Sequence, residues 1–237
     1  MSTERPDDLV RLREEYEQRK RRLAGSDLYS WSNPVNLFTL QQRQRALLKA
    51  LRGHGLADLS GCRLLEMGCG GGGVLAECLN FGVRPGNLHG ADLLFDRLEQ
   101  AQGRLPASAL VNADGQRLPY PAGSFDLVLQ FTALSSILDG AIRRSVCREM
   151  LRVLRPGGLV LWYDFWLNPT NRQTHGIRPA EVRELFPGCR IEFHRITLAP
   201  PLARRIVPVA WALAVVLEGL KMFNSHYLAV IQPPKTG

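Results

Sequence analysis

Residues 64–73 read LLEMGCGGGG and decide how the rest of the chain is interpreted. The apolar start is typical of a buried strand, and the glycine run is typical of a loop that opens a helix. Such a loop leaves backbone N–H groups free at the positive N-terminus of a helix, at the carboxyl edge of a sheet. Glycine also lets the backbone approach a ligand where any Cβ would collide. The stretch therefore predicts a site for the polar part of a nucleotide-like ligand.

One interpretation of this loop is a dinucleotide site. Gly68, Gly70 and Gly73 satisfy the G-x-G-x-x-G spacing after a strand, and Asp92 follows at roughly the twenty-residue offset of a ribose-binding acid. A segment so rich in glycine satisfies many spacings, so this match alone discriminates poorly.

A second interpretation is the pattern acid-x-Gly-x-Gly-x-Gly, in which Glu66 at the strand end is followed by Gly68, Gly70 and Gly72. A carboxylate in this place suits a ligand that carries an ammonium or sulfonium cation, and it is unfavourable beside a pyrophosphate. Glu66 therefore favours S-adenosylmethionine over a dinucleotide.

Four further motifs follow the glycine loop in order. A strand that ends near an acid is predicted twice, at residues 88–92 (LHGAD) and at residues 109–115 (ALVNADG). A fourth strand is predicted at the end of residues 118–128 (LPYPAGSFDLV). The last motif, residues 154–160 (LRPGGLV), ends a helix and begins a fifth strand. Together the five motifs, from about residue 64 to residue 164, resemble the class I S-adenosylmethionine-dependent methyltransferases, especially the small-molecule, methyltransferase type 11-like group.

The resemblance implies an α/β fold: a Rossmann-like, doubly wound, seven-stranded sheet, mostly parallel with an antiparallel last strand, preceded by an N-terminal helical extension. It divides the chain into a helical cap or lid over residues 1–60 and an S-adenosylmethionine-binding domain over residues 61–237. It implies that the glycine loop holds the methionine end of the cofactor, the second strand the ribose and the third the adenine. The cofactor residues expected on this basis are Glu66, Gly68, Cys69, Gly70, Gly72, Asp92, Leu93, Asp114, Gly115, Gln130, Phe131 and Tyr29.

The charge of the chain is uneven along its length. The 237 residues carry a net charge of +8, but residues 61–169 are neutral, so the basic excess lies in the two flanks. A basic rim fits an anionic small substrate, a membrane surface or RNA, and it does not discriminate among them. An Asn/Asp-Pro-Pro-aromatic motif, typical of nucleic-acid amino methyltransferases, does not follow the fourth strand, where residues 130–133 read QFTA. We therefore expect a small-molecule acceptor and no nucleic acid.

The five cysteines show no C-x-x-C spacing, which favours reduced thiols. The charged N-terminus has no apolar segment typical of a secretory signal, so a cytoplasmic protein is expected. Cys69 is interpreted as a small residue that fits the loop, not as a reactive thiol.

The flanks predict mainly helices. Charged residues 8–23 and amphipathic residues 38–51 predict two helices, joined by a turn-rich link in which Tyr29 and Trp31 are candidate lid residues. After the glycine-loop region we expect helices at 140–154 (with Asp139 as N-cap), 178–186 and 203–220, and strands at 160–163, 190–198 and 226–231. The apolar stretch 206–217 is too short to span a bilayer and predicts a helix buried against the sheet, although contact with a membrane surface stays open.

Methyl transfer from a sulfonium is an in-line displacement, so the protein mainly aligns the reactants, and a hydroxyl nucleophile also needs a base. Asp164 is the first candidate for substrate contact or general base, with Tyr163 beside it; the alternative is that Asp164 caps the turn that follows. His175 and His226 are weaker candidates, because the strand opened by His226 is expected to lie far from the methyl group. Asp164 and Asn168 would supply two oxygen ligands to a metal, but the fourth strand ends without an acid, so no metal is expected.

The sequence thus predicts methyl transfer to a small molecule, with oxygen as the favoured nucleophile, in bacterial secondary-metabolite, sugar, quinone or lipid tailoring. A C- or N-methyltransferase, a non-catalytic cofactor-binding protein and a nicotinamide oxidoreductase are the alternatives. The acceptor, the methylated atom and the oligomeric state are not defined by the sequence.

Overall fold

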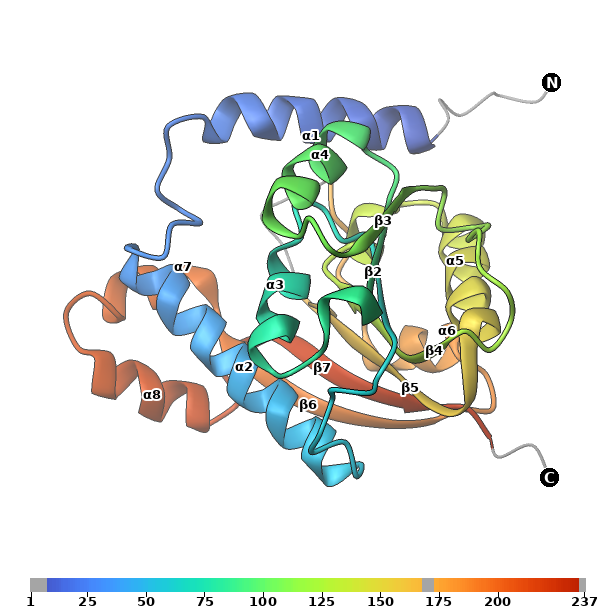
Figure 1. Cartoon of the computed structure of the whole chain (residues 1–237). Helices are drawn as coiled ribbons and strands as arrows, with labels where there is room; N and C mark the ends of the chain where they lie inside the picture. Colours follow the sequence, from blue (N-terminus) through green and yellow to red (C-terminus); the bar gives the residue numbers. More distant parts are fainter. Residues whose placement is uncertain (1–7, 168–172, 235–237) are drawn as a thin grey trace, which may run out of the picture.

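A computed structural model describes residues 8–167 and 173–234, and these form a seven-stranded sheet with helices on both faces (Figure 1). The strand order is β3-β2-β1-β4-β5-β7-β6, and only β7 runs antiparallel to its neighbours. The predicted fold class is confirmed. The strands are β1 Leu64–Met67, β2 Leu88–Asp92, β3 Ala109–Asn112, β4 Phe125–Phe131, β5 Leu154–Phe165, β6 Arg190–Leu198 and β7 Asn224–Gln232.

Helices α2, α3 and α4 lie on one side of the sheet and α5 and α6 on the other (Figure 1). Alternate residues of the central strands feed two cores: Leu161 packs with the α2 and α3 residues, whereas Val160 and Trp162 pack with those of α5 and α6. Burial on both faces explains why these strands read as continuous apolar runs. The helices are α1 Asp8–Leu23, α2 Pro34–Gly53, α3 Gly73–Asn80, α4 Phe95–Arg104, α5 Gly140–Val153, α6 Pro179–Leu185, α7 Pro200–Ile206 and α8 Trp211–Gly219, with short 3-10 turns η1 Pro85–Asn87 and η2 Leu134–Ser136.

The N-terminal helix α1 lies over segments that follow two parallel strands. Arg11 donates a 2.7 Å hydrogen bond to the carbonyl of Ser136, after β4, and the Tyr16 hydroxyl lies 3.3 Å from the Ser136 Oγ. Lys20 forms a 3.0 Å ion pair with Asp96, after β2. These contacts place α1 across the carboxyl edge of the sheet, the edge at which doubly wound folds bind ligands.

Two expectations about the elements are corrected. The single helix expected over residues 203–220 is two helices, α7 and α8, separated at Pro208, because proline lacks the N–H that a helix needs and clashes with the preceding turn. The short strand expected at 160–163 is twelve residues long, since β5 already begins at Leu154. No described helix is both long and apolar enough to cross a bilayer.

Candidate functional site

The glycine loop between β1 and α3 depends on its glycines. Gly68, Gly70 and Gly72 have φ values of 72°, 51° and 74°, in the region that side chains disfavour. A Cβ at Gly68 would lie 2.5 Å from the Ala133 Cβ, so the loop also packs too closely to admit one. The conformation of the loop and its close packing therefore both require glycine at these positions.

Glu66, at the end of β1, is the unusual group of this loop. The side chain is buried, and its Oε2 has no hydrogen-bond partner among the described residues. Burial raises the pKa of this carboxyl well above its usual value, although Arg43 and Arg97 act in the opposite direction. An unpartnered buried acceptor is costly unless a ligand satisfies it.

Asp92, at the end of β2, is tied to the glycine loop. Its Oδ2 accepts a 2.7 Å hydrogen bond from the N–H of Gly70, and its Oδ1 accepts one of 2.9 Å from the N–H of Leu94. The adjacent Leu93 carbonyl accepts a hydrogen bond from Asn112 of β3. Hydrogen bonds of Asp92 and of the neighbouring Leu93 thus join the end of β2 to the glycine loop after β1 and to β3.

The neighbouring cofactor candidates lie at the same edge. Asp114 accepts hydrogen bonds from the backbone and side-chain amides of Gln116, and a Cβ at Gly115 would lie 3.3 Å from the Met67 Sδ. Cys69 is buried, and burial raises the pKa of its thiol, which agrees with an unreactive residue.

Asp164 is fully buried, and its carboxylate accepts three hydrogen bonds. It accepts hydrogen bonds from the Gln130 Nε2 at 3.1 Å, the Ser135 N–H at 3.0 Å and the Phe165 N–H at 2.9 Å. Burial raises its pKa to about 6, against the opposing effect of these hydrogen bonds. These contacts link β4, η2 and β5, so Asp164 helps to hold the turn that follows β5.

Tyr163 lies on the opposite face of β5, in a polar cluster that the sequence did not indicate. Its hydroxyl is 2.8 Å from the Thr197 Oγ1, and its ring stacks on His226 with centroids 4.8 Å apart. Burial raises the pKa of Tyr163 to about 12 and lowers that of His226 to about 3, so both are neutral at pH 7. His226, whose strand was expected to lie far from the methyl group, stacks on the candidate Tyr163 because β7 pairs directly with β5.

Arg43 of α2 completes this cluster. Its guanidinium lies 5.5 Å from the ring centre of Phe131 and 5.6 Å from that of Tyr163, and it forms an ion pair with Glu77 of α3. Arg43, Glu77, Thr197 and His226 come from four elements far apart in the chain. No local spacing in the sequence connects them.

A cavity of about 230 Å³ lies between α1, the link after it and the end of β5. Its lining combines apolar Leu23, Leu28 and Phe165 with the cations Arg19 and Arg22, and it includes Glu15, Tyr29 and Thr174. The Tyr29 hydroxyl accepts a hydrogen bond from Arg19, although 59% of Tyr29 is exposed.

The remaining sequence candidates lie outside this group. His175 pairs with Glu181 at the surface, and Asp139 caps α5, as predicted, by accepting hydrogen bonds from the N–H groups of Ala141 and Ile142. Trp31 is 62% exposed. Asn168 lies outside the described residues.

Residues 65–162 match the sequence profile of the family described as Methyltransferase domain. With the fold and the glycine loop, this match places the central part of the chain in the class I S-adenosylmethionine-dependent methyltransferase family, as the motifs predicted. The unpartnered Oε2 of Glu66 and the glycine loop beside it fit a cofactor that carries cations and a ribose.

Two curated relatives match about half of the chain. A phthiotriol/phenolphthiotriol dimycocerosates methyltransferase 1 of Mycobacterium ulcerans is 39% identical over 116 residues, which are 48% of this chain and 41% of the relative. A fatty-acid O-methyltransferase of Mycolicibacterium smegmatis is 38% identical over 112 residues, which are 46% of this chain and 39% of the relative. The chain thus spans about two fifths of the length of these relatives.

Solved structures share the fold over a longer stretch. The 1,6-didemethyltoxoflavin-N1-methyltransferase of Burkholderia thailandensis, with S-adenosylhomocysteine bound, has a TM-score of 0.63 and 15% identity and covers 98% of this chain and 92% of its own. The [4+2]-cyclase SpnF has a TM-score of 0.57 and 19% identity over 80% of each chain.

Proposed function

We propose that this protein transfers a methyl group from S-adenosylmethionine to an oxygen of an apolar, lipid-like small molecule. The observation that carries the cofactor assignment is the buried, unpartnered Glu66 carboxylate beside a glycine cradle in a methyltransferase domain. Beside a pyrophosphate such a carboxylate would be repelled, whereas beside an ammonium or sulfonium it gains its missing partner.

Each strand end has a role in this proposal. Glu66 and the glycines hold the methionine end, Asp92 binds the ribose hydroxyls, and Asp114 with Gly115 contacts the adenine. The bound cofactor supplies an electrophilic methyl group on a positively charged sulfur. Gln130 and Phe131 lie on opposite faces of the end of β4 and shape the floor between cofactor and acceptor. Helix α1 and Tyr29 act as a lid that excludes water.

The acceptor oxygen forms its bond to the methyl carbon as the carbon–sulfur bond breaks and that electron pair stays on sulfur. A carboxylate acceptor has no proton to lose, whereas a hydroxyl must pass its proton to a base. Asp164, with its raised pKa of about 6, is the base we propose for a hydroxyl acceptor, with Tyr163 orienting the acceptor. Its three internal hydrogen bonds support a positioning role equally well, and the experiment below separates the two.

The acceptor class is supported by the cavity beside α1. Its apolar Leu28 and Phe165 suit a hydrocarbon body, while Arg19 suits a negatively charged or polar head; Arg22 is paired with Glu15 at 2.6 Å. The names of the curated relatives, which concern dimycocerosates and fatty acids, agree with such a molecule.

The first test is calorimetric titration with S-adenosylhomocysteine and with NADH. We expect micromolar binding of the former only, weakened in Glu66→Gln. Binding of NADH alone would overturn the cofactor assignment.

The second test supplies isotopically methyl-labelled S-adenosylmethionine with fatty acids, phenols and amines, and reads the products by mass spectrometry. Labelled methyl esters or ethers support oxygen transfer, and labelled amines or carbon-methylated products overturn it. Cofactor binding without any labelled product across a broad acceptor panel would favour a non-methylating protein, an outcome of interest because a [4+2]-cyclase shares the fold.

Asp164→Asn distinguishes the two roles of this residue. If Asp164 is the base, kcat falls for hydroxyl but not for carboxylate acceptors, and cofactor affinity is unchanged. If it only positions β4 and β5, both acceptor types lose turnover equally and cofactor affinity falls with them.

A further inference from the structure

The outward surface of α8 is apolar, the reverse of an ordinary surface helix. In a surface helix, polar residues face water and the apolar stripe faces the core. In α8 Ala214 and Glu218 are buried, while Leu213 and Val216 are 49% and 59% exposed, and Leu220, directly after the helix, is 57% exposed. Leu213 and Val216 are therefore directed to solvent, whereas Trp211 and Leu217 pack against the core below.

The exposed surface continues at both ends of α8. Val209, before the helix, is 86% exposed, and Met222, after it, is 65% exposed. Helices α7 and α8 lie at the margin of the molecule, beside the edge strand β6 (Figure 1). Five large apolar side chains on one protruding segment form a patch of the kind that marks an interaction site.

The inward side of α8 is firmly held, so the exposure of its outer side is not loose packing. Trp211 contacts Phe38 of α2 edge-to-face with ring centres 5.2 Å apart, and Ala214 packs in the same small core. Glu218 accepts hydrogen bonds from the side chains of Asn224 and Lys221. The patch is thus presented on a fixed element.

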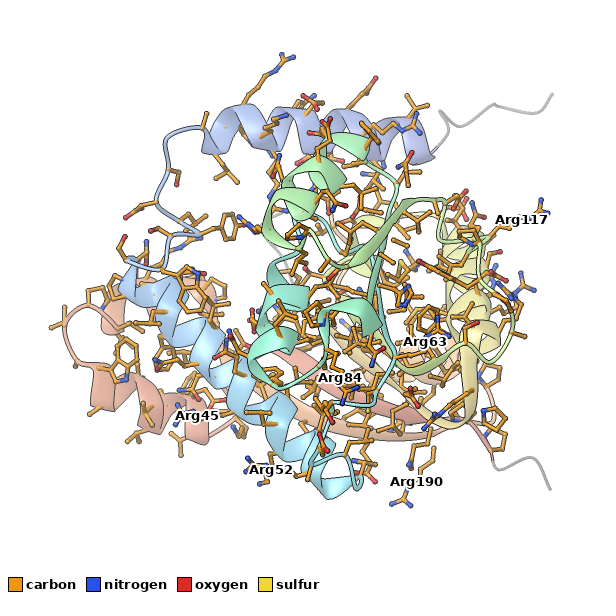
Figure 2. The ribbon with its side chains drawn as sticks, viewed as in Figure 1. Arg45, Arg52, Arg63, Arg84, Arg117 and Arg190 are labelled. Carbon is orange, nitrogen blue, oxygen red and sulfur yellow. The ribbon has the colours of Figure 1, made fainter. Side chains whose placement is uncertain are left out.

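The charge around the patch has one sign. Within residues 199–223, Arg204, Arg205 and Lys221 are exposed, and Glu218, the sole acid of this described segment, is buried. Neither Arg204 nor Arg205 forms an ion pair with a described residue. Arg45 of α2 adds an exposed cation on the same side of the molecule (Figure 2).

We propose that residues 204–222 dock the protein on an anionic lipid surface. An apolar helix face flanked by arginine and lysine suits the boundary between acyl chains and negatively charged headgroups. Helix α8 has nine residues, so it would lie in the interface. A second copy of the chain fits less well, because a two-fold contact would bring Arg204 and Arg205 near their own copies without an exposed acid to pair with them.

The proposal is tested by co-sedimentation of the full chain with vesicles of phosphatidylcholine alone and of phosphatidylcholine mixed with phosphatidylglycerol. This readout does not depend on the proposed catalytic function. We expect sedimentation with the mixed vesicles, weakened by salt, and much less with the neutral ones.

Two matched pairs of variants localise the contact. Val216→Glu should lower vesicle partitioning about tenfold or more, because it replaces an exposed valine, which would be buried in the lipid, with a charged side chain. Val10→Glu, at a 47% exposed valine of α1, should leave vesicle partitioning unchanged.

The double variant R204E/R205E should also lower partitioning about tenfold or more. The double variant R144E/R148E on α5, at the opposite side of the molecule, is its control (Figure 1).

Four outcomes would overturn the proposal. The first is that the protein does not sediment with the mixed vesicles, and the second is that it binds neutral vesicles equally well. The third is that the control variants lose as much vesicle binding as the test variants. The fourth is that the protein binds no vesicles but self-associates in light scattering, and that Val216→Glu abolishes this self-association. Circular dichroism checks that each variant is folded.

Discussion

At the residue scale, Asp92 is both a structural acceptor and the proposed ribose ligand. Asp92→Ala should weaken binding of S-adenosylhomocysteine by about 1–3 kcal/mol, through lost hydrogen bonds to a charged group. Asp92→Asn keeps one oxygen acceptor and should lose less, and Glu192→Ala, which removes a surface ion pair with Arg190 on β6, serves as the control. Calorimetry gives the affinities. Unchanged affinity in a folded Asp92→Ala protein would remove this residue from the site.

Asp164 gives the protein a predictable pH dependence of stability. Its pKa rises from 3.8 to about 6 on folding, so the native state binds this proton more tightly than the unfolded state does. For an acid with a raised pKa, the contribution to the free energy of unfolding falls as pH rises from about 4 to about 6 and stays low above that. Relative to Asp164→Asn, the wild type should therefore lose about 2 kcal/mol between about pH 4.5 and about pH 7.5. Urea unfolding of both proteins at each pH measures this difference, and a constant difference would contradict the raised pKa.

At the scale of elements, the start of α2 is set by its cap. The Asn33 Oδ1 accepts hydrogen bonds from the N–H groups of Val35 and Asn36, and Pro34 occupies the first helical position. Asn33→Ala should reduce the free energy of unfolding by about 1 kcal/mol, whereas Asn33→Asp, an equally good cap, should keep it. Equal unfolding midpoints for Asn33→Ala and the wild type would show that the cap does not stabilise the fold.

Helix α1 belongs to the same scale, because its contacts with the cofactor edge are few. The ring of Tyr16 lies under the Arg97 guanidinium at 4.9 Å, and its hydroxyl reaches Ser136. If α1 is a lid, Tyr16→Ala should speed dissociation of S-adenosylhomocysteine several-fold in stopped-flow measurements, since these contacts close the edge. Arg13→Ala, an exposed change on the same helix, should leave the rate unchanged.

The sequence predicted elements where the signal is local. The glycine loop, the acids after β2 and β3 and the Asp139 cap follow from short patterns, and all lie where they were expected. The apolar run on both sides of Pro208 favours one helix, but the proline divides it into α7 and α8. Helix α2 begins at Pro34, earlier than the predicted start at Phe38, because a proline that is typical of a turn also suits the first position of a helix. The cluster of Arg43, Tyr163 and His226 was beyond prediction, because it is created by the insertion of β7 beside β5 and by the packing of α2.

At the scale of the whole molecule, the N-terminal extension divides into two parts. Leu47 and Leu51 of α2 lie in the same hydrophobic core as Leu75 of α3 and Leu129 of β4. Helix α1, by contrast, touches the sheet edge mainly through polar side chains. Helix α2 is therefore part of the cofactor domain's core, and α1 is the segment that is free to act as a cap.

The Arg43–Glu77 ion pair joins α2 to that core. The free energies of unfolding of variants at these two positions should therefore show that α2 and the core are stabilised together. Both side chains are largely buried, so removing one partner leaves an uncompensated charge, which costs about 3–5 kcal/mol. Arg43→Met and Glu77→Gln should each destabilise the protein by about that much, whereas the double variant should recover a large part because neither charge remains. Urea unfolding followed by tryptophan fluorescence and by circular dichroism gives the coupling energy. Coincident transitions from the two probes are expected if α2 unfolds with the sheet. Additive losses in the double variant would contradict a coupled pair, and a separate early transition would show that α2 unfolds independently of the domain it covers.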